Sequence, residues 1–228
     1  MKKIILLVIL AAAGVYWLLL EKPGLYFDKI REYRIFTLHA RGALPENMDA
    51  VLDKAYNKIS AAELFSQDKK FDIYLTAGRN EFLFFTPFQQ GNYYRVNPAR
   101  GYIYMAPSDF VSDQIRTAPG AKEYKALSLE IAGAAAREMA RRLVEPLKYM
   151  LMSEWKLRGY SERVNGGTGT YMPADICKGA DPARLDYEYG QAMDYAIRVD
   201  GLSIVELLGK DYSYETVEKA LKKMNCGG

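Results

Sequence analysis

Residues 131–162 read IAGAAAREMARRLVEPLKYMLMSEWKLRGYSE, and this stretch decides the fold. Its apolar spacing predicts one helix over residues 122–144 and two more over residues 147–150 and 154–164. Arg137 and Arg141 are four residues apart, so they lie on one face of the first helix, with Glu138 and Glu145 beside them. The chain therefore places an unusually charged pair of helices next to a run of small residues.

The stretch resembles the active-site region of the gluzincin metallopeptidases. In that family one helix carries H-E-x-x-H, and the next helix supplies a third zinc ligand, a glutamate, in a W-x-x-E-G context. The matching residues here are REMAR at 137–141 and WKLRGYSE at 155–162. The resemblance covers about residues 71–224, is specific only in this region, and includes residues 187–208, which are similar to small membrane-associated bacterial members. It implies an α+β fold, a zincin-like domain with a small mixed sheet followed by a helical half.

All three metal-ligand positions of that motif carry arginine in this chain. Arg137 and Arg141 stand at the two histidine positions, and Arg158 stands at the position of the third ligand. Arginine stays protonated and has no lone pair for a metal. The chain has a single histidine, His39, so a zinc site with two histidines is excluded by counting. No Asp-rich loop has calcium or magnesium spacing, and we expect no metal or other cofactor.

Three interpretations of the arginines stay open. They can form a salt-bridge network with Glu138 and Glu162 that joins two helices in place of a metal, which we favour. They can form a pocket with excess positive charge for a carboxylate or phosphate. They can also be ordinary solvated charges, each of little energetic value.

The resemblance implies a pseudopeptidase, a domain of peptidase ancestry that serves in binding or assembly. Glu138 stands at the position of the general base, but no metal would acidify its water, so its role is vestigial. The alternative is a metal-independent hydrolase that uses Glu138 in the old cleft. A third possibility is that another surface carries the function. His39 lies in a predicted strand, where a structural role is more common than a catalytic one.

The amino terminus carries a membrane signal. After Lys2 and Lys3, residues 4–20 form an uninterrupted apolar run of 17 residues, about 25 Å long as a helix. Basic residues before the run predict a cytoplasmic amino terminus and a single-pass protein with a periplasmic domain. A cleaved signal peptide is the alternative, with alanines at 11–13 near a cleavage site. We therefore expect a membrane anchor over residues 1–22 and the zincin-like domain over residues 23–228.

Composition narrows the choice of partner and compartment. A net charge of +3 is too mild to indicate nucleic acid, so the expected partners are the membrane, an anionic ligand or another protein. Two cysteines, Cys177 and Cys226, are too few for a disulfide framework. They can pair in an oxidising compartment or remain unrelated thiols, and sequence does not decide between these.

The remaining elements follow from periodicity and turn residues. Strands come first and helices later, which is the order of an α+β domain. The glycine-containing segment 165–181 is the longest expected loop. The predicted strands are 34–40, 71–77, 93–96 and 102–105, and the further helices are 45–64, 79–85, 185–199, 204–208 and 214–224.

Overall fold

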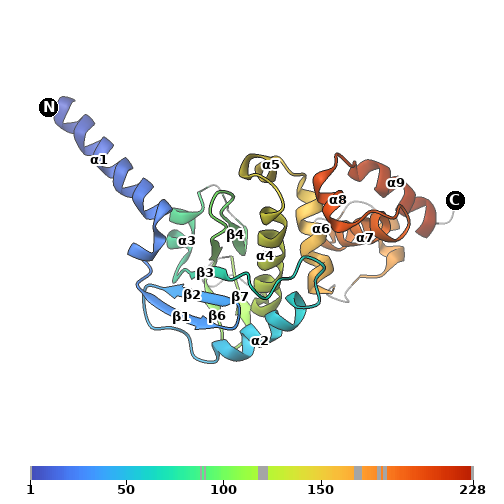
Figure 1. Cartoon of the computed structure of the whole chain (residues 1–228), viewed down its shortest axis with the longest axis horizontal. Helices are drawn as coiled ribbons and strands as arrows, with labels where there is room; N and C mark the ends of the chain where they lie inside the picture. Colours follow the sequence, from blue (N-terminus) through green and yellow to red (C-terminus); the bar gives the residue numbers. More distant parts are fainter. Residues whose placement is uncertain are drawn as a thin grey trace.

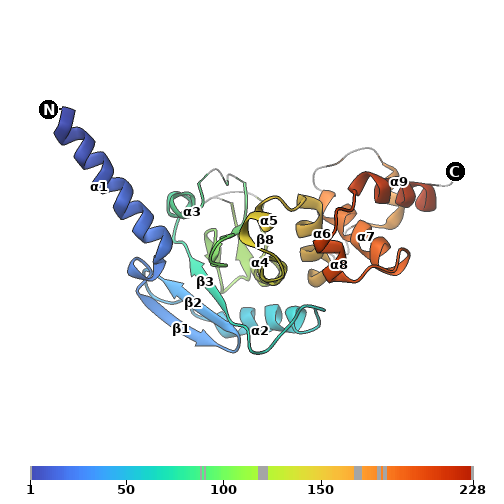
Figure 2. The ribbon, with the colours of Figure 1, turned by 45° about the horizontal axis from the view of Figure 1, so that its top comes forward.

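The computed structural model describes residues 2–87, 89, 91–117, 123–166, 171–178, 181 and 184–226. It has the α+β class that the order of the sequence patterns predicts. An apolar helix comes first, a small mixed sheet follows, and the second half of the chain is mainly helical (Figure 1). The helical half lies at the end of the protein away from the first helix (Figures 1 and 2).

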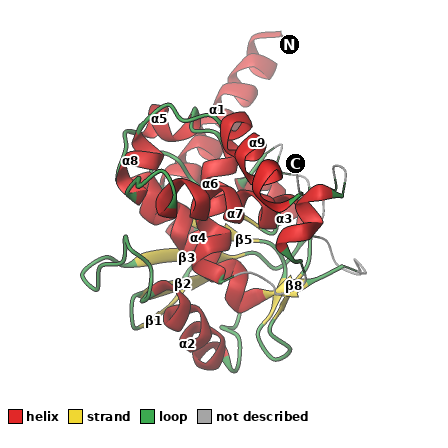
Figure 3. Ribbon diagram, turned by 90° about the vertical axis from the view of Figure 1, so that its right-hand side faces the viewer, coloured by secondary structure: helices red, strands yellow, loops and turns green. Residues whose placement is uncertain are grey.

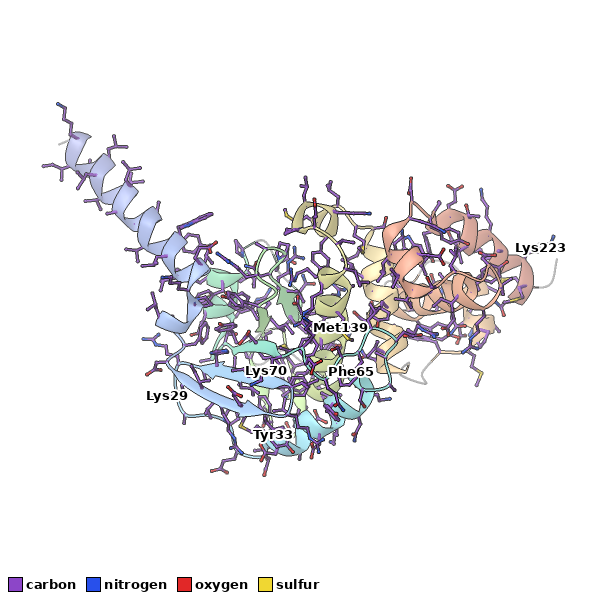
Figure 4. All side chains as sticks on the ribbon, in the orientation of Figure 1. Lys29, Tyr33, Phe65, Lys70, Met139 and Lys223 are labelled. Atoms are coloured by element: carbon purple, nitrogen blue, oxygen red, sulfur yellow. A yellow bond between two sulfur atoms is a disulfide. The ribbon has the colours of Figure 1, made fainter. Side chains whose placement is uncertain are left out.

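The first helix, α1 (Lys2–Glu21), stands clear of the rest of the protein over most of its length (Figure 4). The carboxyl-terminal part of α1 contacts the rest of the protein through Tyr16. The Tyr16 hydroxyl donates to the carbonyl of Phe84 at 2.9 Å, and its ring packs edge-on against the Phe84 ring. Arg100 also donates to the Glu21 carboxylate through Nε at 3.0 Å. A short 3₁₀ turn, η1 (Pro23–Leu25), then leads into the sheet.

The main sheet has five strands in the order β1-β2-β3-β5-β4. The three central strands run parallel, and each outer strand runs antiparallel to its neighbour. All five residues of β2 are buried, as expected for a central strand with both faces covered. The strands are β1 (Lys29–Tyr33), β2 (Phe36–Ala40), β3 (Phe71–Leu75), β4 (Tyr94–Val96) and β5 (Ile103–Met105).

Two helices complete the first half. The apolar stripe of α2 (Met48–Ile59) is buried, and α2 packs against the central helix of the second half. The helix α3 (Arg79–Phe85) has the bounds that its pattern predicts and buries Phe82 and Phe85. The prediction of a longer helix over 45–64 was wrong at both ends: Asn47 has a left-handed backbone, with φ of 57°, and the chain turns after Ser60.

The central helix is α4 (Leu127–Arg142), which Figure 3 shows among the other helices. Its small buried residues let neighbouring helices approach closely. Ser161 Oγ donates to the carbonyl of Gly133 at 3.1 Å, where α4 meets α6. A Cβ at Gly159 would lie 2.6 Å from the carbonyl oxygen of Tyr189, so α6 and α7 need glycine at this crossing. The other elements here are α5 (Pro146–Met150), α6 (Glu154–Asn165), η2 (Pro173–Cys177), α7 (Leu185–Arg198), α8 (Ile204–Gly209) and α9 (Tyr214–Asn225).

The start of α4 corrects the predicted helix 122–144. Residues before Leu127 pair as a strand, β8 (Lys125–Ala126), in a second sheet with β6 (Ser108–Asp109) and β7 (Gln114–Ile115). Asp113 accepts hydrogen bonds from the backbone N–H and the hydroxyl of Ser128, at 2.8 and 2.9 Å, and so satisfies the first turn of α4. That partner is distant in sequence, so local periodicity does not reveal it. Lys122 lies outside the described residues.

The predicted loop 165–181 is shorter in the structure. The helix α6 continues to Asn165, and η2 forms a helical turn within the segment. Residues 167–170, 179 and 180 lie outside the described part of the chain. Cys177, at the end of η2, is disulfide-bonded to Cys226 after α9, which settles the choice that the sequence left open.

Candidate functional site

A cavity of about 250 Å³ lies where β4, β8, α4, α6 and α7 meet. Its wall combines tyrosine and amide side chains with many charges. Three cations and four carboxylates line it, a formal balance of one negative charge: Lys125, Arg137, Arg158, Glu130, Glu154, Glu162 and Asp186. Two of the three predicted arginines therefore converge on one cavity.

Arg137 enters the cavity from α4. Its Nη2 donates to Oε1 of Glu154, the first residue of α6, at 3.2 Å, and its guanidinium lies over the Tyr94 ring with 5.3 Å to the centroid. The side chain is only 18% exposed. Burial raises the pKa of the Tyr94 hydroxyl, so this ring is neutral beside the cation. The ion pair joins α4 to α6.

Arg158 enters the same cavity from α6. Its Nε donates to Oδ1 of Asp186 in α7 at 2.5 Å, and its guanidinium lies over the Tyr189 ring. Lys125 Nζ lies 3.4 Å from the other Asp186 oxygen and 3.4 Å from Oε1 of Glu130. Asp186 therefore connects α6 and α7 with β8.

The pKa values of the two carboxyl groups that flank Lys125 are shifted in opposite directions. Burial raises the pKa of Glu130. The positive charge of Lys125 acts in the opposite direction, but its effect is smaller. Burial also acts on Asp186, but the hydrogen bond from Arg158 and the charge of Lys125 outweigh it and lower the pKa of Asp186. The same cation thus stands between one carboxyl that resists ionisation and one that favours it.

Arg141 belongs to a different cluster, centred on Glu138. Arg141 Nη2 donates to Glu138 Oε1 at 2.8 Å, and Arg142 Nε donates to the same oxygen at 2.9 Å. Arg142 also donates to the backbone carbonyl of Lys70 at 2.6 Å. The Glu138 side chain is 3% exposed, and Gly101 lies against its carboxylate. Neither Glu138 nor Arg141 is among the described residues that line the cavity.

We expected Arg137 and Arg141 of α4 to belong to one cluster, and the structure places them in two. Arg137 and Arg141 are one turn apart, but Arg137 extends toward α6 while Arg141 turns back onto Glu138 of its own helix. Glu162 does line the cavity with Arg137 and Arg158, and it packs against Gly190 of α7. Glu145 lies at the start of α5 and lines a separate groove.

Most partners of Arg137 and Arg158 were not predicted from the sequence. Glu130 lies seven residues before Arg137, and Glu154 lies four residues before Arg158, so helical spacing offered a signal for both. Asp186 and Lys125 lie in other elements and gave no local signal. His39 is buried in β2 within the sheet, where its Nε2 lies 2.9 Å from Asp72 and its ring stacks on Tyr74.

Among the residues that the structure describes, no group of three or more histidine, cysteine, aspartate or glutamate side chains is placed to hold a metal ion. Comparison of the chain with protein-family models, with curated proteins and with solved structures returned no match. Within the described part of the chain, one helix, over Lys3–Glu21, is long and apolar enough to cross a membrane.

Proposed function

We propose that this chain is a membrane-anchored pseudopeptidase: a zincin-like domain with a metal-free cleft, held outside the cytoplasm, that binds or assembles with another protein. The resemblance of residues 137–141 and 155–162 to the gluzincin motif supports the ancestry. So does the order of elements, with an antiparallel edge strand, β4, beside the motif helix α4.

The observation that carries the proposal is the pairing of Arg137 with Glu154 and of Arg158 with Asp186 inside one cavity. In a zinc peptidase of this type the metal would bridge the two helices. Here two charged hydrogen bonds join α4 to α6 and α6 to α7. Guanidinium groups that are already paired with carboxylates hold the cleft together without a metal.

The position of Glu138 disfavours the alternative of a metal-independent hydrolase. A general base needs a free lone pair within reach of substrate and water. The Glu138 carboxylate is almost fully buried and accepts hydrogen bonds from Arg141 and Arg142. It therefore serves better as a structural anchor for two arginines than as a base.

The expected orientation has two supports. Lys2 and Lys3 precede the apolar run of α1, which favours a cytoplasmic amino terminus. The bond between Cys177 and Cys226 suits an oxidising compartment. Together they favour a single-pass protein with its domain in the periplasm.

The cavity chemistry favours a protein segment over a free anion. Arg137 and Arg158 already have carboxylate partners, so an anion would have to displace Glu154 or Asp186. Tyr93 and Tyr94 supply broad amphipathic surfaces of the kind that protein interfaces use. The small volume accommodates one or two side chains of a partner rather than a whole ligand.

Metal content and hydrolysis test the proposal directly. The full chain, purified in nanodiscs, is analysed for bound metal and assayed on peptide and ester panels. We expect no stoichiometric zinc and no hydrolysis. Stoichiometric zinc, or hydrolysis that Glu138→Gln abolishes, would overturn the pseudopeptidase and, in the second case, favour the hydrolase.

A photo-crosslinking side chain tests the binding role of the cavity. In cells that express the full chain, a photoreactive residue at position 93 should give a discrete adduct, and one at Val111, an exposed residue between β6 and β7, should not. Adding Arg158→Gln, which removes the cation without placing another carboxylate beside Asp186, should weaken the adduct, with circular dichroism of the purified variant as the check that the domain is folded. Equal adducts at both positions would count against the cavity as the binding site.

A further inference from the structure

The short helix α5 presents an apolar patch to the outside. Leu147 is 67% exposed, Met150 is 63% exposed, and Leu151, directly after the helix, is 77% exposed. Tyr149, between them in sequence, is buried on the opposite side. These three exposed side chains, which we name the α5 patch, are spaced three and four residues apart and so share one side of a helical turn.

The position of α5 relates it to α1. Figures 1 and 3 both show α5 at the top of the domain, on the side toward which the amino-terminal end of α1 extends. Trp17, near the carboxyl-terminal end of α1, is 67% exposed. Leu25, in the 3₁₀ turn after α1, is 62% exposed. Tryptophan near the end of a membrane helix lies at the level of the lipid headgroups. Leu25 lies at the end of η1, four residues after the last residue of α1.

We propose that the α5 patch is a second membrane contact, which lies in the headgroup layer of the bilayer that α1 crosses. This rests on the anchor role of α1 in the proposed function. Because α1 tethers the domain, α5 stays close to the lipid surface and modest apolar burial suffices to hold it there. The domain would then lie against the membrane at two separated points and have a fixed orientation.

The polar surroundings of the patch fit this layer. Lys148 is exposed between Leu147 and Met150, and a lysine here can lay its aliphatic stem among acyl chains while its ammonium reaches phosphate. Leu147 and Leu151 line a groove with Glu145 and Lys210, charges of both signs. The surface therefore suits the boundary between headgroups and acyl chains rather than the hydrocarbon core.

Lipid-borne quenching of a fluorescent label tests the contact. Single cysteines replace exposed residues in the full chain, which is labelled with a polarity-sensitive dye without reductant so that Cys177 and Cys226 stay bonded. The positions are Leu151, Leu10 in the middle of α1, and Val111. The protein is reconstituted in nanodiscs of phosphatidylcholine with a minority of phosphatidylglycerol, with or without lipids that carry a quencher.

We expect strong quenching at position 10, clear quenching and a blue shift at position 151, and neither at position 111. Quenching at 10 but not at 151 would overturn the second contact and leave the anchor intact. No quenching at either position would overturn the anchor and the contact together. A blue shift at 151 without lipid quenching would overturn the contact in favour of a second copy of the chain. Leu147→Glu in the labelled Leu151→Cys chain should reduce quenching at 151, and unchanged quenching would argue against the patch.

Discussion

The carboxylate of Glu138 occupies the space that a side chain at Gly101 would need. A Cβ at Gly101 would lie 2.3 Å from Glu138 Oε1, and Gly101 has a φ of +77°, which other residues rarely adopt. The turn between β4 and β5 therefore closes directly over the buried charge of α4. This contact connects the edge of the sheet to the motif helix.

Gly101→Ala should destabilise the protein by about 2 to 4 kcal/mol, because a left-handed alanine costs roughly 1–2 kcal/mol and the displaced carboxylate loses hydrogen bonds. The measurement is the free energy of unfolding in urea. Gly209→Ala is the matched control, since nothing lies within 4 Å of a Cβ there and its backbone is not left-handed. Equal effects of the two substitutions would show that Gly101 and Glu138 are not in contact.

Glu138→Gln should cost about 2 to 3 kcal/mol of stability, because Arg141 and Arg142 lose the carboxylate that pairs with both of them. Urea unfolding measures the loss. Glu215→Gln removes an exposed pair with Lys219 on α9 and should change stability by less than about 0.5 kcal/mol. If the Glu138 variant matched this control, the buried cluster would have no structural role.

Local patterns predicted most helices and four of the five strands of the main sheet. They did not predict β1 (Lys29–Tyr33), which pairs with β2 at the edge of that sheet. The spacing of apolar residues placed α3 at its observed bounds and the helices α5 to α9 within one residue of theirs, whereas the start of α4 was predicted five residues too early. The strands β6, β7 and β8 have two residues each, too few for a periodic pattern. The true start of α4 depends on Asp113, which lies far from it in sequence.

The same distinction holds for the candidate site. The arginines were found because their positions match a motif with fixed spacing. Their separation into two clusters follows from side-chain directions: Arg137 meets Glu154 on α6, whereas Arg141 meets Glu138 within α4. Spacing along a helix gives the face of a residue but not the partner that its long side chain reaches.

Glu130→Gln should raise the melting temperature at neutral pH. The folded state raises the pKa of Glu130 above its unfolded value, so it binds the proton more tightly than the unfolded chain. Above the unfolded pKa of about 4.3, Glu130 ionises readily in the unfolded chain, whereas burial opposes its ionisation in the folded state. The wild type therefore loses stability as pH rises above this value. Glutamine removes this loss, while Lys125 keeps Asp186 as a partner.

The advantage of Glu130→Gln should shrink as pH falls toward 4.3, the unfolded pKa of glutamate, because the native glutamate is then protonated as well. Thermal melts across this range measure the difference. Glu46→Gln, which removes a carboxylate at an exposed position, is the control for the loss of one negative charge. A pH-independent gain for Glu130→Gln would contradict the raised pKa of the buried carboxyl.

Reduction of the disulfide should destabilise the helical half. The bond between Cys177 and Cys226 spans 49 residues of sequence and ties η2 to the end of α9, so its loss should cost about 2 to 4 kcal/mol by freeing the unfolded chain. Urea unfolding with and without reductant measures this cost. The double variant Cys177→Ser with Cys226→Ser should have the same free energy of unfolding as the reduced wild type, and adding reductant should not change it. If reductant lowered the stability of that variant too, the effect would not come from this bond.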